Sequence, residues 1–125
     1  MDTAIIVIQV FLIIGFTIGG LSQLFIPHSQ YAKLPAQGWA TDFKPWHVKL
    51  IGFLKVCATA GMIASLFLPS LKMLTPLAAL GIAMVMAGAI ATHLRRLEYP
   101  NIVGNLVFLG FALFVAYGRL FGFAV

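Results

Sequence analysis

Four long apolar segments limit what this chain can fold into. They cover residues 4–26, 47–68, 74–93 and 101–123, and polar connections separate them. A helix of about 20 predominantly apolar residues crosses the hydrocarbon core of a bilayer, which is about 30 Å thick. Each segment meets that length. We therefore expect an all-α fold, an integral membrane bundle of four transmembrane helices that forms a single membrane domain over residues 1–125.

The composition excludes most soluble folds. Of the 125 residues, 62% are hydrophobic and only 9% are charged, whereas charged residues make up about a quarter of an ordinary globular chain. A soluble domain of this length would expose large apolar patches and aggregate, so lipid is the expected solvent for the outer helix faces. The net charge of +5 does not indicate nucleic acid binding, because the Lys and Arg residues flank the apolar segments instead of forming one polar face.

The connection over residues 27–46 is polar, and it is the only one long enough to hold structure of its own. It contains Trp39, Phe43 and Trp46. Because aromatic side chains of this kind collect at membrane interfaces, we expect the connection to lie along the interface.

Positive charge is distributed unequally between the two ends of the predicted bundle. With four crossings, the first and third connections share one face, while both termini and the second connection share the other. The first face carries Lys33, Lys44, Lys49, Arg95 and Arg96, and the second carries Lys72 and Arg119. Positive residues favour the cytoplasmic face. This predicts that loops 27–46 and 94–100 are cytoplasmic and that both termini are outside; the alternative is that the long first loop is an external cap.

Small residues occur where transmembrane helices need to approach closely, since helices in lipid associate mainly through close backbone packing. The first segment contains a GxxxG motif formed by Gly15 and Gly19, and the third contains alanines at intervals of four. These alanines are Ala79, Ala83, Ala87 and Ala91. Packing within the four-helix bundle is the favoured interpretation, because each helix must first find neighbours in its own chain. A homodimer seam is the alternative.

Five ionisable residues in or beside the helices are the candidates for ligand binding, since charge in hydrocarbon is costly and usually has a function. They are Lys55, His93, Glu98, Arg96 and Arg119. Lys55 lies one to two turns inside the second helix, roughly 7–10 Å along its axis. Its ammonium group either extends to the interface or faces the bundle and meets Glu98.

The other candidates also have structural interpretations beside the functional one. His93 ends the third helix, where the helix dipole favours its protonated form, and a C-terminal cap is the alternative to ligand contact. Arg96 and Glu98 are explained by membrane orientation and local pairing. Arg119 either extends outward to the interface or pairs inside the bundle with Gln9.

Metal and redox chemistry have little support in the sequence. Cys57 is the only cysteine, which excludes an intrachain disulfide, a Cys-x-x-Cys pair and a four-cysteine metal site. The histidines His28, His47 and His93 are expected at one membrane face near Cys57, but their spacing matches no known ligand motif. We therefore predict no metal site and no haem. Without a nucleophile elbow, a phosphate-binding glycine loop or paired carboxylates, the sequence excludes an autonomous hydrolase or kinase and has no candidate catalytic residue.

Four stretches together resemble the DoxX-like family of small membrane proteins. They are residues 48–55 (VKLIGFLK), 76–89 (PLAALGIAMVMAGA), 92–98 (THLRRLE) and 117–119 (YGR). The resemblance implies a four-helix membrane bundle in a bacterial inner (plasma) membrane. Some relatives are named as subunits of a thiosulfate:quinone oxidoreductase, and others act in membrane oxidoreductase complexes or as assembly chaperones. Many relatives carry Glu where this chain has Lys55, which puts any function of that carboxylate in doubt here.

Two function hypotheses follow. The preferred one is an accessory or anchoring subunit of a larger membrane complex such as an oxidoreductase, without enzymatic activity of its own. The alternative is a binding protein or enzyme for a hydrophobic molecule such as a quinone or lipid, with Lys55, His93 and Glu98 as polar contacts at the mouth of a pocket between helices. The expected partners are the lipid bilayer and other membrane subunits or a second copy of the chain, and quinone is the candidate cofactor.

Overall fold

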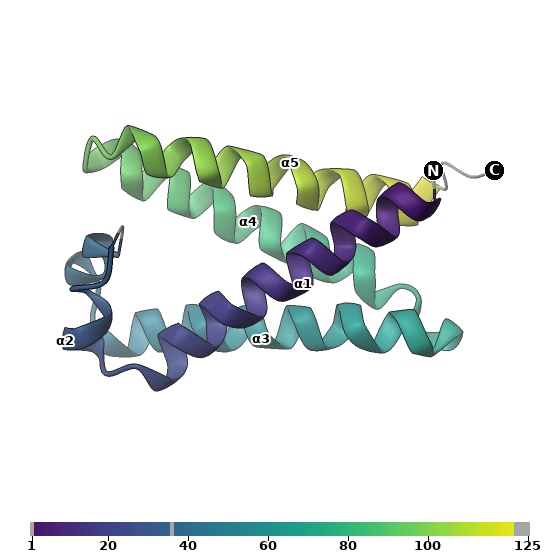
Figure 1. Cartoon of the computed structure of the whole chain (residues 1–125), viewed down its shortest axis with the longest axis horizontal. Coiled ribbons are helices and arrows are strands. Elements are labelled where there is room, and N and C mark those ends of the chain that lie inside the picture. Colours follow the sequence, from purple (N-terminus) through teal and green to yellow (C-terminus); the bar gives the residue numbers. More distant parts are fainter. Residues whose placement is uncertain (1, 36, 122–125) are drawn as a thin grey trace.

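A computed structural model describes residues 2–35 and 37–121, and this part of the chain contains helices and no strand (Figure 1). The elements in chain order are α1 (Asp2–Phe25), α2 (His28–Tyr31), the 3-10 turn η1 (Gly38–Asp42), α3 (Pro45–Phe67), the 3-10 turn η2 (Pro69–Leu71), α4 (Leu74–Arg95) and α5 (Tyr99–Phe121). The helices α1, α3, α4 and α5 are long and apolar enough to cross a membrane. The predicted all-α bundle of four transmembrane helices is therefore confirmed.

Helix α1 begins at Asp2 instead of residue 4, and α3 and α5 also begin earlier than the apolar segments do. Helix α3 begins at Pro45 instead of residue 47, and α5 begins at Tyr99 instead of residue 101. Each has a proline in its first turn, where the missing amide donor would have had no partner within the helix. The last two residues of the predicted segment 101–123 lie outside the described part of the chain.

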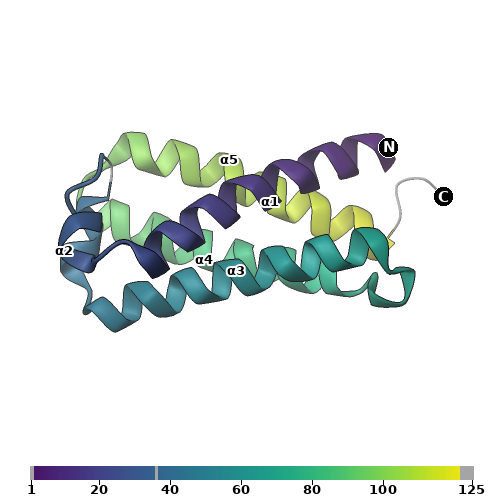
Figure 2. The same cartoon turned by 60° about the horizontal axis from the view of Figure 1, so that its bottom comes forward.

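The long helices pack mainly as two pairs, α1 with α3 and α4 with α5. Buried side chains join the pairs in one apolar core. Its largest members are Leu12, Phe16, Met62, Ile82, Met86 and Val115. Figures 1 and 2 show that the start of α1 and the end of α5 lie at one end of the bundle and the connecting segment with α2 lies at the other. In Figure 1 the two pairs diverge toward the end with α2.

Helices α1 and α3 approach most closely at Gly20 and Gly52. A Cβ atom added to Gly20 would lie 2.8 Å from the Gly52 carbonyl oxygen, and one added to Gly52 would lie 2.7 Å from Gln23 Cβ. Both positions therefore require glycine. The GxxxG pair from the sequence lies beside this crossing: Gly15 faces the ring of Phe108, and a Cβ on Gly19 would lie 4.0 Å from Lys55 Nζ.

The four alanines at intervals of four in α4, which we call the alanine ladder, change from buried to exposed along the helix. Ala79 is fully buried and Ala83 is 8% exposed, both in the core. Ala87 and Ala91 are exposed. The first half of the ladder thus packs inside the bundle, and the second half continues past the point where the helix pairs separate.

A hydrogen-bond network ties all four long helices together near the chain ends. The buried amide of Gln9 donates from Nε2 to the Met62 carbonyl and to Thr75 Oγ1, each at 3.1 Å. Its Oε1 accepts from Arg119 Nε at 3.1 Å and from Nη2 at 2.9 Å. The hydroxyls of Ser65 and Thr75 are also hydrogen-bonded. Of the two interpretations of Arg119, the structure shows the pairing with Gln9. We call the hydrogen-bonded group of Gln9, Met62, Ser65, Thr75 and Arg119 the Gln9 network.

Candidate functional site

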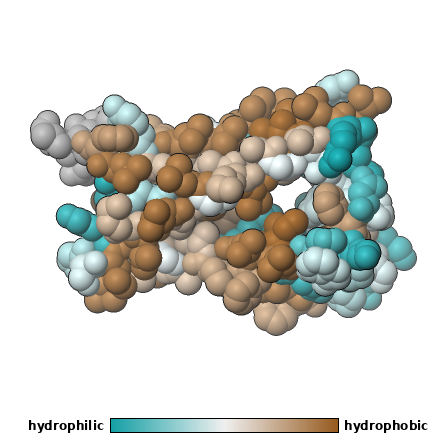
Figure 3. Space-filling model, turned by 180° about the vertical axis from the view of Figure 1, so that it is seen from behind, coloured by the Kyte–Doolittle hydropathy of each residue, from teal (hydrophilic) through white to brown (hydrophobic). Residues whose placement is uncertain are grey.

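A cavity of about 790 Å³ lies between the two helix pairs, at the end of the bundle that carries α2. All four long helices and the segment 31–43 contribute to its walls. Figure 3, which views the molecule from behind, shows the hollow reaching the surface beside the polar end. Its volume is within the range of roughly 300–1,000 Å³ that is common for small-molecule sites. It is therefore large enough for a sizeable organic ligand.

Aromatic side chains form the inner wall of the cavity. Phe16 of α1 and Phe108 of α5 both line it, with their ring centroids 5.4 Å apart in an edge-to-face arrangement. Phe11 and Phe111 extend the same cluster behind them. These rings close the cavity where α1 and α5 meet, so its deep end is apolar.

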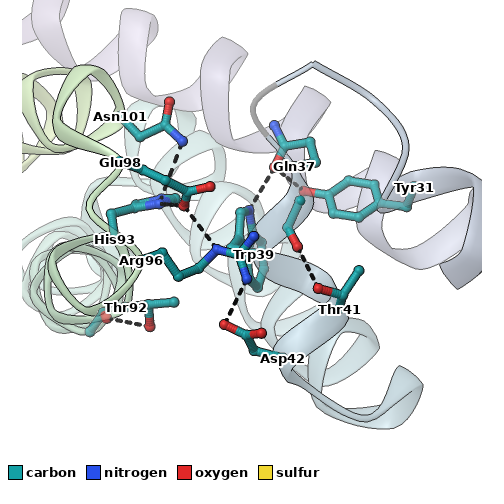
Figure 4. Close-up of polar contacts among 12 residues, drawn as sticks. Tyr31, Gln37, Trp39, Thr41, Asp42, Thr92, His93, Arg96, Glu98 and Asn101 are labelled. Atoms are coloured by element: carbon teal, nitrogen blue, oxygen red, sulfur yellow. Dashed lines mark hydrogen bonds and ion pairs between the residues drawn. The ribbon is translucent and has the colours of Figure 1, made fainter.

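The segment between α1 and α3 covers the outer end of the cavity. The Tyr31 hydroxyl donates to Gln37 Oε1 at 2.9 Å, and Trp39 Nε1 donates to the same oxygen at 2.8 Å (Figure 4). Trp39 also packs edge to face on Phe43 at 5.7 Å. Burial raises the pKa of Tyr31 to about 12, so the phenol stays neutral. The sequence places Trp39 and Phe43 at the interface; both line the cavity, whereas Trp46 is 58% exposed.

Lys49 holds the start of this covering segment in place. Its ammonium group donates to the carbonyl oxygens of Leu24 and Ile26, each at 2.8 Å. Carbonyls at the end of a helix have no partner within the helix, and a lysine side chain is a suitable donor for them. Lys49 thus stabilises the C-terminal end of α1 as well as contributing positive charge to this end of the bundle.

A charged cluster joins the covering segment to the turn between α4 and α5 (Figure 4). Arg96 Nη1 lies 2.9 Å from Asp42 Oδ2, and Arg96 Nε lies 3.2 Å from Glu98 Oε1. The same Glu98 oxygen lies 2.8 Å from Nδ1 of the buried His93. The hydrogen bond with His93, followed by the contacts with Arg96, lowers the pKa of the Glu98 carboxyl despite its partial burial. Glu98 is therefore a carboxylate that accepts from His93 and forms an ion pair with Arg96.

The backbone of the α4–α5 turn sets the position of Glu98. Leu97 has a positive φ of 58°, and the amide of Glu98 donates to the His93 carbonyl at 2.9 Å while that of Leu97 donates to the Leu94 carbonyl at 3.2 Å. This pair of bonds is a Schellman motif, a common way to end a helix. It turns the chain so that the Glu98 side chain meets His93 in the preceding turn.

Lys55 projects into the cavity from α3. Its ammonium nitrogen lies 5.7 Å from the centroid of the Phe16 ring, a distance suited to a cation–π contact. Within the described residues it has no hydrogen bond and no ion pair. The expected contact with Glu98 is not formed, because Glu98 binds His93 and Arg96 instead.

Comparison with known proteins identifies the family. The profile of the DoxX-like family matches residues 7–115, which includes most of every membrane-spanning helix. The chain belongs to the DoxX-like family. Comparisons with curated proteins and with solved structures gave no match. This DoxX-like protein is therefore a multi-pass integral membrane protein.

The five candidate residues of the DoxX-like chain fall into three places. Lys55 and His93 line the cavity. Arg96 and Glu98 do not line the cavity. Glu98 contacts His93, and Arg96 contacts Asp42 of the covering segment. Arg119 lies at the opposite end, in the Gln9 network.

Sequence reasoning did not assign Trp39, Arg95 and Asn105 to the site, although all three line the cavity. Asn105 has its Nδ2 buried without a hydrogen-bond partner. Asn101 and Asn105 are four residues apart in α5, so both lie on one face of the helix. This spacing of two amide side chains in an apolar segment is the sequence feature from which Asn105 could have been identified as a site residue.

Metal ligands do not converge in this DoxX-like chain. Within residues 2–35 and 37–121, no three His, Cys, Asp or Glu side chains are grouped so that they could hold a metal ion. The rings of His47 and Trp46 are stacked at 3.7 Å, and Cys57 is exposed on α3.

Proposed function

We propose that this DoxX-like protein binds an amphiphilic molecule, such as a quinone or a lipid, in the cavity between its helix pairs. The observation that carries the proposal is the cavity itself, about 790 Å³ in volume, with aromatic walls at its deep end and polar side chains at the other. A ligand with an apolar body and a polar head matches this division. Because the hollow reaches the surface between helices, the ligand enters from the bilayer.

His93 and Lys55 supply the polar contacts. Since a carboxylate only accepts hydrogen bonds, the contact with Glu98 keeps a proton on Nδ1 of His93. That contact also fixes the orientation of the imidazole ring at the cavity wall. Lys55 presents an ammonium group with no partner in the described residues. A quinone carbonyl or a lipid head group accepts from Lys55, whereas Nε2 of an imidazole protonated at Nδ1 accepts from a hydroxyl or amine on the ligand.

Paired glycine substitutions test the proposal. Gly88 lines the cavity, whereas Gly81, seven residues earlier in α4, does not. A Cβ added at either position meets no atom within 4 Å, so both positions have room for a larger side chain. We expect Gly88→Phe to reduce the amount of quinone or lipid that co-purifies in mild detergent, measured by mass spectrometry of the extract. Gly81→Phe is the control and should retain it. Equal retention by both variants would refute binding in the cavity.

A second candidate function is that of an accessory subunit of a larger membrane complex. It is supported by Gly81 of α4 and Gly110 of α5, where the helix surfaces are open to close approach by another helix. Intact-complex mass measurement after gentle solubilisation tests it. A stoichiometric second protein supports the accessory role, two copies of this chain support a homodimer, and a single chain refutes both.

The orientation belongs to the proposal as well. The end with the cavity carries Lys33, Lys44, Lys49 and Arg95, which favours the cytoplasmic face of a bacterial inner membrane. A Cys57→Ala, Lys33→Cys double variant should react with a membrane-impermeant thiol reagent in inside-out vesicles only. Reaction in intact cells would reverse the orientation.

A further inference from the structure

Three of the side chains that line the cavity carry hydrogen-bond donors without an acceptor in the described protein. Lys55, Arg95 and Asn105 all line it. The ammonium of Lys55 and the guanidinium of Arg95 have no ion pair with a described residue. Nδ2 of Asn105 is buried without a partner. Arg95 is exposed and can be hydrated, whereas Lys55 and the buried Nδ2 of Asn105 need an acceptor that enters the cavity.

The described acceptors near the cavity are already in use. Gln37 Oε1 accepts from both Tyr31 and Trp39. The carboxylates of Asp42 and Glu98 bind Arg96 and His93, and neither lines the cavity. The cavity wall thus carries positive charge with no carboxylate to balance it.

The depth of Lys55 makes this imbalance costly. It is the eleventh residue of α3, and at about 1.5 Å per residue it lies roughly 15 Å along the axis from the first residue of the helix. A cation at that depth is unfavourable unless a counter-charge or polar groups accompany it. The contact with the Phe16 ring compensates only part of the lost hydration.

We propose that the cavity selects amphiphiles with an anionic head, a carboxylate or a phosphate, held by Lys55 beside the ring of Phe16. Asn105 donates to the same head, and Arg95 attracts it at the mouth. The apolar chain lies against the aromatic wall formed by Phe16 and Phe108. This inference rests on the proposed function, since it specifies the ligand that the cavity takes.

Tryptophan quenching provides the test, because one of the two tryptophans lines the cavity. Trp46→Phe leaves Trp39 as the single fluorophore. The probes are three compounds with the same dibrominated stearyl chain, whose heads are a carboxylate, a phosphate and an alcohol. Bromine quenches only on close contact, so quenching of Trp39 reports occupancy of the cavity in the full-length, detergent-solubilised protein.

We expect at least one anionic probe to bind about tenfold or more tightly than the alcohol, as a charge-assisted hydrogen bond predicts. Tighter binding of the carboxylate identifies a free fatty acid as the source of the head, and tighter binding of the phosphate identifies a phospholipid. Equal affinity of all three probes would overturn the inference while leaving the proposed function intact. If none of the three probes quenches Trp39, both the inference and the proposed function are overturned.

Substitutions at two lysines distinguish a specific contact with the ligand head from a general effect of surface charge. Lys55→Met should remove most of the preference for the anionic head, and Lys55→Arg should retain part of it. Lys33 is exposed at the same end of the bundle and does not line the cavity, so Lys33→Met removes the same charge and should leave the preference unchanged. An equal loss in Lys33→Met and Lys55→Met would overturn the role of Lys55. Size-exclusion profiles and helical signal confirm that each variant is folded.

Discussion

The contact between Gly20 and Gly52 predicts a large difference between two identical substitutions. In Gly52→Ala the new methyl would lie 2.7 Å from Gln23 Cβ and 2.8 Å from the Gly20 carbonyl oxygen. Neither atom is the flexible end of a side chain, so α1 and α3 must move apart. Overpacking of this kind costs about 1–3 kcal/mol, and the higher helix propensity of alanine returns up to about 1 kcal/mol.

We therefore expect Gly52→Ala to lower the free energy of unfolding by about 1–2 kcal/mol. Gly81→Ala is the matched control, since its methyl meets no atom within 4 Å. It should be neutral or more stable by up to about 1 kcal/mol. Reversible unfolding in mixed micelles, followed by circular dichroism, measures both variants. If Gly52→Ala is as stable as Gly81→Ala, the close approach of α1 and α3 is not as described.

Three further outcomes follow from the helix ends and the polar clusters. Leu97→Gly should stabilise the protein by about 0.5–1 kcal/mol in thermal unfolding, because glycine adopts the positive φ of this turn without strain; lower stability would contradict this. The lowered pKa of Glu98 adds stability that is present above its unfolded pKa and is lost as the pH falls through its folded pKa. Glu98→Gln should therefore flatten the acid limb of the stability–pH profile, and an unchanged profile would exclude this contribution. Arg119→Leu should cost about 1–2 kcal/mol in micelle unfolding; the same substitution should cost less in a Gln9→Leu background, and full additivity would mean that the two residues do not interact.

The four membrane-spanning helices could be predicted from the sequence because the bilayer imposes one length and one composition on each of them. The first residues of α3 and α5 could not be predicted, because the prolines at residues 45 and 100 are compatible with both a loop and a first helical turn. Lys55 and His93 were found from their charge in apolar segments. These inferences needed only properties that a single helix carries by itself.

The remaining features depend on how helices cross, which a single segment does not specify. Gly52 contacts Gly20 only because α1 and α3 cross at these two residues. In the sequence, all four glycines at positions 15, 19, 20 and 52 stand in apolar segments, so nothing marks the two at the crossing. The orientation of Trp39 toward the cavity depends on the Gln37 amide that accepts from its indole. The sequence left open whether Lys55 extends to the interface or meets Glu98 across the bundle, whereas a Schellman turn brings the Glu98 carboxylate back to His93 of α4.

The two ends of the bundle use buried polar groups for opposite purposes. In the Gln9 network the amide has donors for its oxygen and acceptors for its nitrogen, so it joins four helices without an outstanding desolvation cost. The ammonium of Lys55 and Nδ2 of Asn105 have no such hydrogen-bond partners in the described chain, and the Phe16 ring offsets only part of the desolvation cost of Lys55. That cost is recovered only when an acceptor enters. The proposed ligand head therefore belongs at the end where polar groups are left unsatisfied, while the Gln9 network holds the helix pairs together at the opposite end.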